Sequence, residues 1–146
     1  MRKLLVAISL LAFAASAASA DPISDRQAAM KERGKIVGTL SKMVKGEQDF
    51  DAALVLSSLQ TLQENAEKFD VDALFPAGTE TGGDTTVSPK VWEDMAGFKA
   101  AEDKYLADVK AVNAAAPADL EALKTQLAVV GQNCAACHKA FRIKKD

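Results

Sequence analysis

The chain contains four stretches in which apolar residues recur every three or four positions. This spacing places apolar side chains along one face of an α-helix. The first predicted helix covers residues 24–45, with Gly46 as its stop, and its apolar positions include Met30, Val37, Leu40 and Val44. In the second helix the spacing continues unbroken through Ala52, Val55, Leu59, Leu62, Ala66 and Phe69.

A connection over residues 70–86, rich in glycine, separates the second helix from the third. It is long for a helical bundle, where about two to eight residues are usual, so we expect a crossing connection or a functional cover. Ser88 is predicted as the N-cap of the third helix and Pro89 as its first residue. The inward positions of that helix are Val91, Met95, Phe98, Tyr105, Val109 and Val112.

The fourth helix is predicted to open at Pro117, with Asp119 in its first turn. Its apolar positions again alternate steps of three and four, through Leu120, Leu123, Leu127, Val130, Cys134, Cys137 and Phe141. Both cysteines therefore lie on the face that points toward the core. These four amphipathic helices predict an all-α fold, an antiparallel four-helix bundle.

The first 20 residues have the pattern of a secretory signal peptide. Arg2 and Lys3 precede an apolar run that is too short to cross a bilayer, and residues 18–20 (ASA) fit a cleavage site. We therefore expect one mature domain over residues 21–146, exported to the periplasm and without a membrane span.

Charge narrows the possible partners of this domain. Without Arg2 and Lys3, 16 basic residues stand against 20 acidic ones, and the net charge changes from −2 for the whole chain to −4. Mild acidity argues against binding to nucleic acid.

The sequence CAACH, residues 134–138, holds both cysteines and the only histidine of the chain. A thioredoxin-like dithiol begins a helix after a strand, whereas this pair lies near the end of a helix in a chain with no predicted strand. Structural zinc needs four ligands, and this motif supplies three. A disulfide between Cys134 and Cys137 remains open, because the i,i+3 spacing on a helix permits one and export places the chain where disulfides persist.

Covalent attachment of haem is the favoured interpretation, because C-x-x-C-H is its signature. Cys134 and Cys137 share one helix face, so both sulfurs can form thioethers to a single haem. His138 then projects toward the iron, for which a neutral imidazole is a good axial ligand. The motif predicts one covalently bound haem c with His138 on the proximal side of its iron.

With this motif on its last helix, the chain resembles the class II c-type cytochromes, which include cytochromes c′ and methionine-ligated cytochromes of the c-556 type. The likeness covers essentially the whole mature chain. It includes RQAAM at residues 26–30, LFP at 74–76, VW at 91–92 and CAACHKAFR at 134–142. The resemblance implies a four-helix bundle with haem c attached near the C-terminus.

The resemblance also implies a distal ligand. One position of the first helix holds a non-coordinating Leu or Phe in cytochromes c′ and a methionine in the c-556 type, and the alignment puts Met30 there. Gly34 and Gly38 follow on the same side; each glycine costs about 1 kcal/mol relative to alanine in a helix, which fits close approach of haem or of another helix. From position alone Met30 is more simply a core filler, and Met43 and Met95 are the fallback ligands.

Three further residues take roles from the resemblance. Arg26, one turn before Met30, is implied as a partner of a haem propionate, or else it is a solvated charge. Trp92 is implied as an aromatic residue near the haem edge, or else it packs in the core. Arg142 is implied beside the proximal histidine, or else it complements the end of a helix.

The expected function is that of an electron carrier, not an enzyme, with iron held between His138 and Met30. Its partners would be other redox proteins, met transiently, and a homodimer through the first two helices is an open possibility. If Met30 does not coordinate, the iron has five ligands and binds NO or CO, as in cytochromes c′. A third alternative is a haem-free bundle closed by a disulfide, with a binding role.

Overall fold

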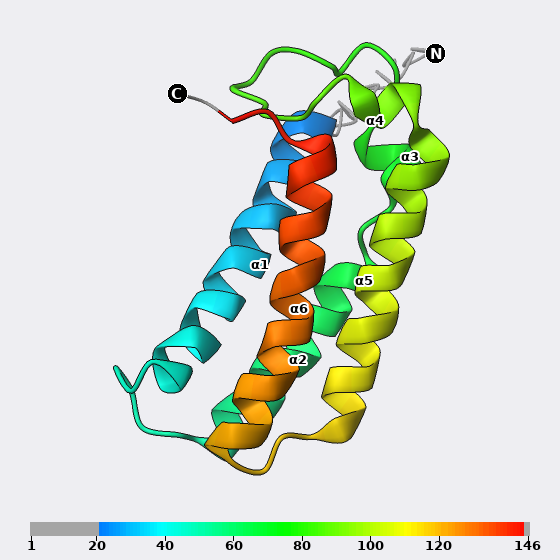
Figure 1. Cartoon of the computed structure of the whole chain (residues 1–146). Coiled ribbons are helices and arrows are strands. Elements are labelled where there is room, and N and C mark those ends of the chain that lie inside the picture. The colour runs from blue at the N-terminus through cyan, green and yellow to red at the C-terminus, as the bar shows by residue number, and fades with distance from the viewer. Residues whose placement is uncertain (1–20, 145–146) are drawn as a thin grey trace, which may run out of the picture.

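The computed structural model describes residues 21–144 and confirms the all-α prediction (Figure 1). The predicted signal peptide lies outside the described residues. The helices are α1 (Pro22–Val44), α2 (Ala52–Glu67), α3 (Val71–Leu74), α4 (Lys90–Glu93), α5 (Met95–Ala115) and α6 (Leu120–Phe141). Across residues 21–144 the only extended pairing is a single antiparallel bridge between Val87 and Arg142.

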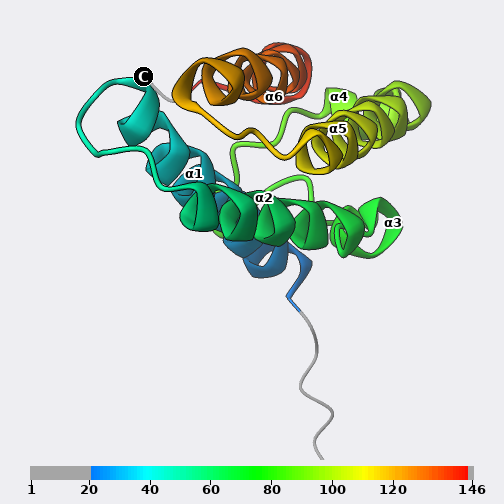
Figure 2. The same cartoon turned by 90° about the horizontal axis from the view of Figure 1, so that it is seen from below.

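The four long helices form an antiparallel bundle in two layers. Helix α1 packs against α2 and α6, and α5 packs against α2 and α6. Seen along the bundle, α1 and α2 form one layer and α5 and α6 the other (Figure 2). The connections α1–α2 and α5–α6 lie together at one end, and the long connection crosses the other end with α3 and α4 (Figure 1).

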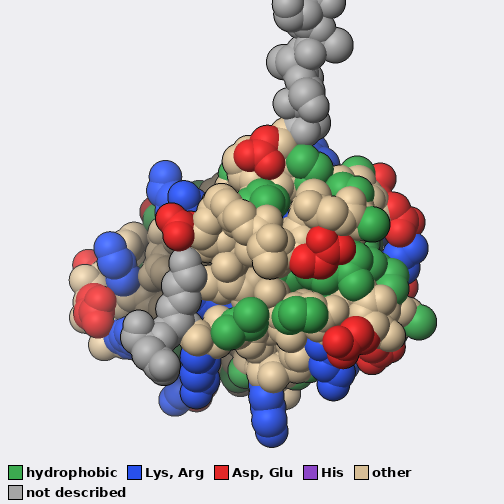
Figure 3. All heavy atoms as spheres, turned by 90° about the horizontal axis from the view of Figure 1, so that it is seen from above, with side chains coloured by type: hydrophobic (Ala, Val, Ile, Leu, Met, Phe, Trp, Pro, Cys, Tyr) green, Lys and Arg blue, Asp and Glu red, His purple; other side chains and the backbone are tan. Residues whose placement is uncertain are grey.

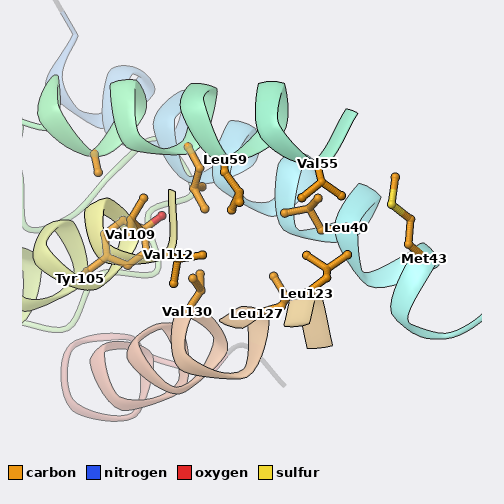
Figure 4. Close-up of a cluster of buried hydrophobic side chains, with 12 residues drawn as sticks. Leu40, Met43, Val55, Leu59, Tyr105, Val109, Val112, Leu123, Leu127 and Val130 are labelled. Atoms are coloured by element: carbon orange, nitrogen blue, oxygen red, sulfur yellow. The ribbon is translucent and has the colours of Figure 1, made fainter. Parts of the chain in front are cut away.

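The middle of the bundle and the end with the short connections are filled by a cluster of mostly aliphatic side chains, which we call the aliphatic core (Figure 4). Its buried members come from all four long helices. They are Leu40, Met43, Val55, Leu59, Leu62, Ala66, Tyr105, Val109, Val112, Leu123, Leu127 and Val130. Burying one such aliphatic side chain stabilises a fold by roughly 1.5–3 kcal/mol, so this cluster supplies much of the stability of the bundle.

A second cluster, rich in aromatic rings, lies at the end with the long connection, and we call it the aromatic cluster. Phe98 makes edge-to-face contacts with Phe75 and Phe141, with ring centroids 4.7 and 5.2 Å apart. The buried members of the cluster are Phe69, Val71, Phe75, Val91, Phe98 and Phe141. The connection is thus fastened to the helices by Val71 and Phe75.

Each long helix starts after an aspartate whose carboxylate accepts a backbone N–H. Asp21, Asp51, Asp94 and Asp119 accept from the residue two or three positions later, at 2.8–3.1 Å. Such caps satisfy donors that have no partner within the helix. They also correct two predicted boundaries: α1 starts at Pro22, and Asp119 caps α6 from outside its first turn.

The predicted third helix is broken, which the sequence pattern did not indicate. Helix α4 ends at Glu93 because Asp94 leaves the helical conformation (φ −134°, ψ 58°) to cap α5. Gly97 leaves room for this cap, since a Cβ there would collide with the Asp94 carboxylate. The N-cap of α4 is Pro89 and not the predicted Ser88, so Pro89 lies before the helix instead of being its first residue. The N-cap residue makes no side-chain hydrogen bond to the helix.

Two more predictions need correction. The 70–86 connection is not free of helix, since its first residues form α3, capped by Asp70. The first members of two predicted apolar stripes, Ala52 and Leu120, are exposed. Each is the first residue of its helix at the end of the bundle, where no neighbouring helix covers it.

Candidate functional site

The CAACH motif lies on the last two turns of α6, between the two clusters. Cys134 packs against the aliphatic core and Cys137 against the aromatic cluster. Both are partly buried free thiols, so the disulfide that the sequence left open is not formed. His138 follows on the exposed side of the helix. Within residues 21–144 no group of three or more His, Cys, Asp or Glu side chains is arranged to hold a metal ion.

The aromatic cluster brings together predicted residues that are far apart in the sequence. Met30 of α1, Trp92 of α4 and Cys137 of α6 all pack against it. Met95 joins the same cluster, whereas Met43 is fully buried in the aliphatic core. The distal candidate Met30 and the attachment candidate Cys137 therefore approach one hydrophobic site from two neighbouring helices.

Gly34 and Gly38 are not explained by helix packing. A Cβ at either position would meet no atom within 4 Å, and both residues are exposed. Within this chain the two glycines therefore do not serve close contact with another helix. They leave an uncovered strip along α1, beginning one turn after Met30.

Arg26 is buried, with 2% of its surface exposed, and is not the solvated charge that the sequence left open. Its two terminal nitrogens donate four hydrogen bonds to the long connection, to Leu74 O, Thr79 Oγ1, Thr79 O and Thr85 Oγ1, at 2.6–3.1 Å. The guanidinium also lies 5.0 Å from the centroid of the Phe75 ring. Arg26 thus ties the start of α1 to the connection.

Replacing Arg26 with lysine is expected to lower the free energy of unfolding by about 2–4 kcal/mol, because the four bonds from a buried charged group cannot all be made by one ammonium. Urea unfolding followed by circular dichroism measures the loss. Gln27→Ala is the matched control, since Gln27 makes one exposed bond to the same connection, to Gly83 O at 2.7 Å. Equal effects of the two substitutions would contradict this role of Arg26.

Trp92 and Arg142 both contact the long connection. The indole nitrogen of Trp92 donates to Phe75 O at 3.0 Å. Arg142 is exposed and follows α6 as its C-cap, where its Nε donates to Thr86 Oγ1 at 3.3 Å. These contacts account for both residues structurally, and the roles beside haem that the resemblance implied for them stay predictions.

Arg33 and Glu102 were not singled out from the sequence, although they form the least exposed salt bridge among the described residues. Arg33 of α1 has 7% of its surface exposed and pairs with Glu102 of α5 through two bonds of 2.9 and 3.0 Å. A signal existed, because Arg33 follows Arg26 and Met30 at helical spacing and continues their face toward Val37 and Leu40. A cation on the apolar face of a helix needs a buried partner.

Comparison with known proteins agrees with this arrangement. The family model described as Cytochrome C′ matches residues 21–142. Cytochrome c′ of Rhodopseudomonas palustris is 39% identical over 132 residues, covering 88% of this chain and 86% of that protein. Cytochrome c-556 of Agrobacterium fabrum is 36% identical over 127 residues, covering 87% and 84%. The chain belongs to the cytochrome c′ family.

Solved structures of the family share the fold of this cytochrome. A structure of cytochrome c′ from Rhodopseudomonas palustris superposes with a TM-score of 0.81 at 38% identity, over 88% of this chain and all of that one. A nitric oxide complex of a variant of cytochrome c prime from Alcaligenes xylosoxidans gives 0.74 at 32% identity, over 86% and 95%. The cofactor of this family is covalently attached haem c, and it is the cofactor of this cytochrome.

The residues of this cytochrome fit haem c. Two free thiols lie at i and i+3 on a partly buried helix face. Two buried polar atoms have no hydrogen-bond partner in the described part of the chain, Arg26 Nε and the hydroxyl of Tyr105. Because Arg26 already uses its four terminal N–H groups, only Nε is free for a propionate, and a bidentate contact with a carboxylate would require breaking a bond to the connection.

The electrostatics of the motif favour its neutral forms. Burial raises the pKa of the Cys134 thiol and raises the pKa of Cys137 to about 11. Partial burial of the ring lowers the pKa of His138, and the charges of Arg142 and Arg33 lower it further. An imidazole that stays neutral keeps a lone pair for a metal ion.

Proposed function

We propose that this cytochrome carries electrons, with its haem iron held between His138 of α6 and Met30 of α1. The observation that supports this best is the position of Met30, which packs from α1 against the same aromatic cluster that Cys137 contacts from α6. Haem c supplies a one-electron couple between ferric and ferrous iron. The thioether of Met30 would favour the ferrous form and so raise the reduction potential.

The remaining parts of the site have matching tasks in this proposal. Cys134 and Cys137 would attach the haem through thioethers, and the neutral ring of His138 would be the proximal ligand. Arg26 Nε would face a propionate, while Phe75, Phe98 and the other aromatic side chains would exclude water from the haem. A site that excludes water and moves little needs little reorganisation when its charge changes.

We also place this cytochrome in the periplasm, with residues 1–20 removed as a signal peptide. The family model begins at residue 21, and Asp21 caps α1. Among the described helices none is long and apolar enough to cross a membrane. The proposed mature domain, which starts at residue 21, therefore contains the whole family match and all of α1.

Partners of an electron carrier would be redox proteins that bind through small, transient interfaces. The end of the molecule with the long connection mixes hydrophobic, acidic and basic side chains and carries no single-sign charge field (Figure 3). A homodimer through α1 and α2 is the other association that we retain. Leu56, 42% exposed on α2, is the large apolar side chain that such an interface would cover.

A second candidate function is binding of NO or CO at an open distal site. It is favoured by the naming of several relatives as cytochrome c′ and by the nitric oxide complex solved for one of them. In this alternative Met30 would only fill space beside the iron. The two functions differ in whether the distal position is closed.

Absorption spectra of the mature protein distinguish the two functions. For an electron carrier we expect low-spin spectra in both oxidation states, a methionine–iron charge-transfer band when oxidised, and little response to CO. A high-spin spectrum with rapid CO binding would replace this proposal with the gas-binding alternative.

A further inference from the structure

The ion pair between Arg33 and Glu102 spans the interior of the bundle. Arg33 Nη1 and Nη2 donate to the two carboxylate oxygens of Glu102 at 2.9 and 3.0 Å, and Nε donates to Asn65 Oδ1 at 2.7 Å. These contacts join α1 to α5 and α2. All three groups of the guanidinium are therefore held in one geometry, which a planar, charged fork makes rigid.

Aromatic rings and a further amide complete this cluster. The Arg33 guanidinium lies 4.3 Å from the ring centroid of Phe69 and 4.5 Å from that of Tyr105. Asn65, itself 6% exposed, also donates to the backbone carbonyl of Ala29, which directly precedes Met30. The charges are thus largely removed from solvent. Charges buried in this way are screened less than charges at the surface.

The pair lies beside the haem-binding groups. Arg33 follows Met30 by three residues on α1, so the two side chains occupy the same helix face. Phe69, whose ring the Arg33 guanidinium faces, is a buried member of the aromatic cluster against which both Met30 and Cys137 pack. A fixed cation and its anion therefore lie next to the hydrophobic site that the proposed distal ligand and the attachment cysteine share.

Stability alone does not account for a pair in this place. Removing two charges from water is costly, and apolar replacements of a buried pair are often as stable. The other ion pairs of the described residues are more exposed; in Lys110–Glu67, which joins α5 to α2, the side chains are 49% and 42% exposed. Among residues 21–144 the most deeply buried pair thus lies beside the aromatic cluster, which points to a role connected with the haem.

We propose that Arg33 and Glu102 are positioning residues that set the reduction potential of the haem through their balanced charges. Arg33 favours the ferrous form, which carries one positive charge less than the ferric form, and Glu102 offsets it while locking its orientation. This inference rests on the proposed redox function.

Single substitutions are expected to move the potential in opposite directions. Glu102→Gln leaves the Arg33 cation unbalanced, and because arginine does not lose its proton, the potential should rise. Arg33→Met leaves the anion, and the potential should fall. A unit charge on the order of 10 Å from a metal at an effective dielectric constant of about 20 changes the equilibrium constant about tenfold, which is about 59 mV for one electron.

Spectroelectrochemical titration of the holoprotein measures these shifts. Arg33→Lys keeps the charge but loses the planar fork, so the potential should stay near that of the wild type while stability falls. If the role of Arg33 were purely structural, the potential would change together with the stability. Glu67→Gln is the matched control, because it unpairs Lys110 at the surface between α2 and α5 and should leave the potential unchanged.

The signs decide the outcome. Opposite shifts beyond the control support the proposal, and either single variant tests it alone if the other does not fold. Shifts in the same direction, or none beyond Glu67→Gln, would overturn it. Failure of the redox function itself is read separately, from a high-spin wild-type spectrum, because the potential can be measured in either spin state.

Discussion

Under the proposed ligation, replacing Met30 with leucine is expected to change the haem from low spin to high spin and to let its iron bind CO stoichiometrically. Leucine has nearly the volume of methionine and no sulfur lone pair, so the packing against the aromatic cluster is kept while the ligand is lost. Loss of the methionine–iron charge-transfer band and appearance of CO binding are read from absorption spectra.

The control for this substitution lies in the same cluster. Met95 of α5 packs against the aromatic side chains as Met30 does, and Met95→Leu should leave the spectrum unchanged. A Met30→Leu protein that stays low-spin would show that another group occupies the distal position. A spectral change in Met95→Leu alone would transfer the assignment to Met95.

Replacing Arg33 with methionine is expected to cost about 3–5 kcal/mol of unfolding free energy, the usual effect of leaving one buried charge without its partner. Total stabilities of domains are about 5–15 kcal/mol, so the variant should unfold at clearly lower urea concentration. Glu102 loses both of its bonds, and Asn65 loses the donor to its side-chain oxygen.

Two comparisons make this second prediction specific. Lys110→Met removes the partner of Glu67 at the surface between α5 and α2, where solvent screens the charges, and should change stability little. The double variant Arg33→Met/Glu102→Leu leaves no unpaired charge and should regain most of the loss. If the double variant were as unstable as Arg33→Met, the cost would come from packing and not from the ion pair.

The long connection and the site depend on one another in this fold. Arg26 is held by carbonyl and hydroxyl groups of the connection, and Trp92 donates to Phe75 within it. Phe75 in turn packs against Phe98 of α5. A loosened connection would therefore disturb the aromatic cluster that Met30 and Cys137 share, which links stability to haem environment.

The sequence alone was sufficient to predict the four long helical segments and the attachment motif, but not the break at Asp94 or the exact helix starts. Apolar residues at steps of three and four define one face of each long helix, because this spacing acts within a few residues. The CAACH motif is equally local, since its two thiols and imidazole lie within one and a half turns of α6. Fold class, bundle topology and the identity of the cofactor followed from these signals.

The burial of charged residues was decided only by the tertiary structure. Arg26 and Arg33 lie on the apolar face of the first helix, but the sequence does not identify their partners, which lie far away, at Thr79 and Glu102. At Asp94 the chain can either continue one helix or end α4 and cap α5. The sequence pattern does not indicate which conformation has the lower free energy, because the difference comes from contacts between distant segments.

The sequence by itself therefore determined that this chain forms a haem-binding bundle of four amphipathic helices with a CAACH motif on the last one. The tertiary structure alone decided that Met30, Trp92 and Cys137 meet in one aromatic cluster, and that a buried Arg33–Glu102 pair stands beside it. The physical reason is range: helix formation and capping act over one or two turns, whereas burial and charge pairing depend on which helix faces lie together.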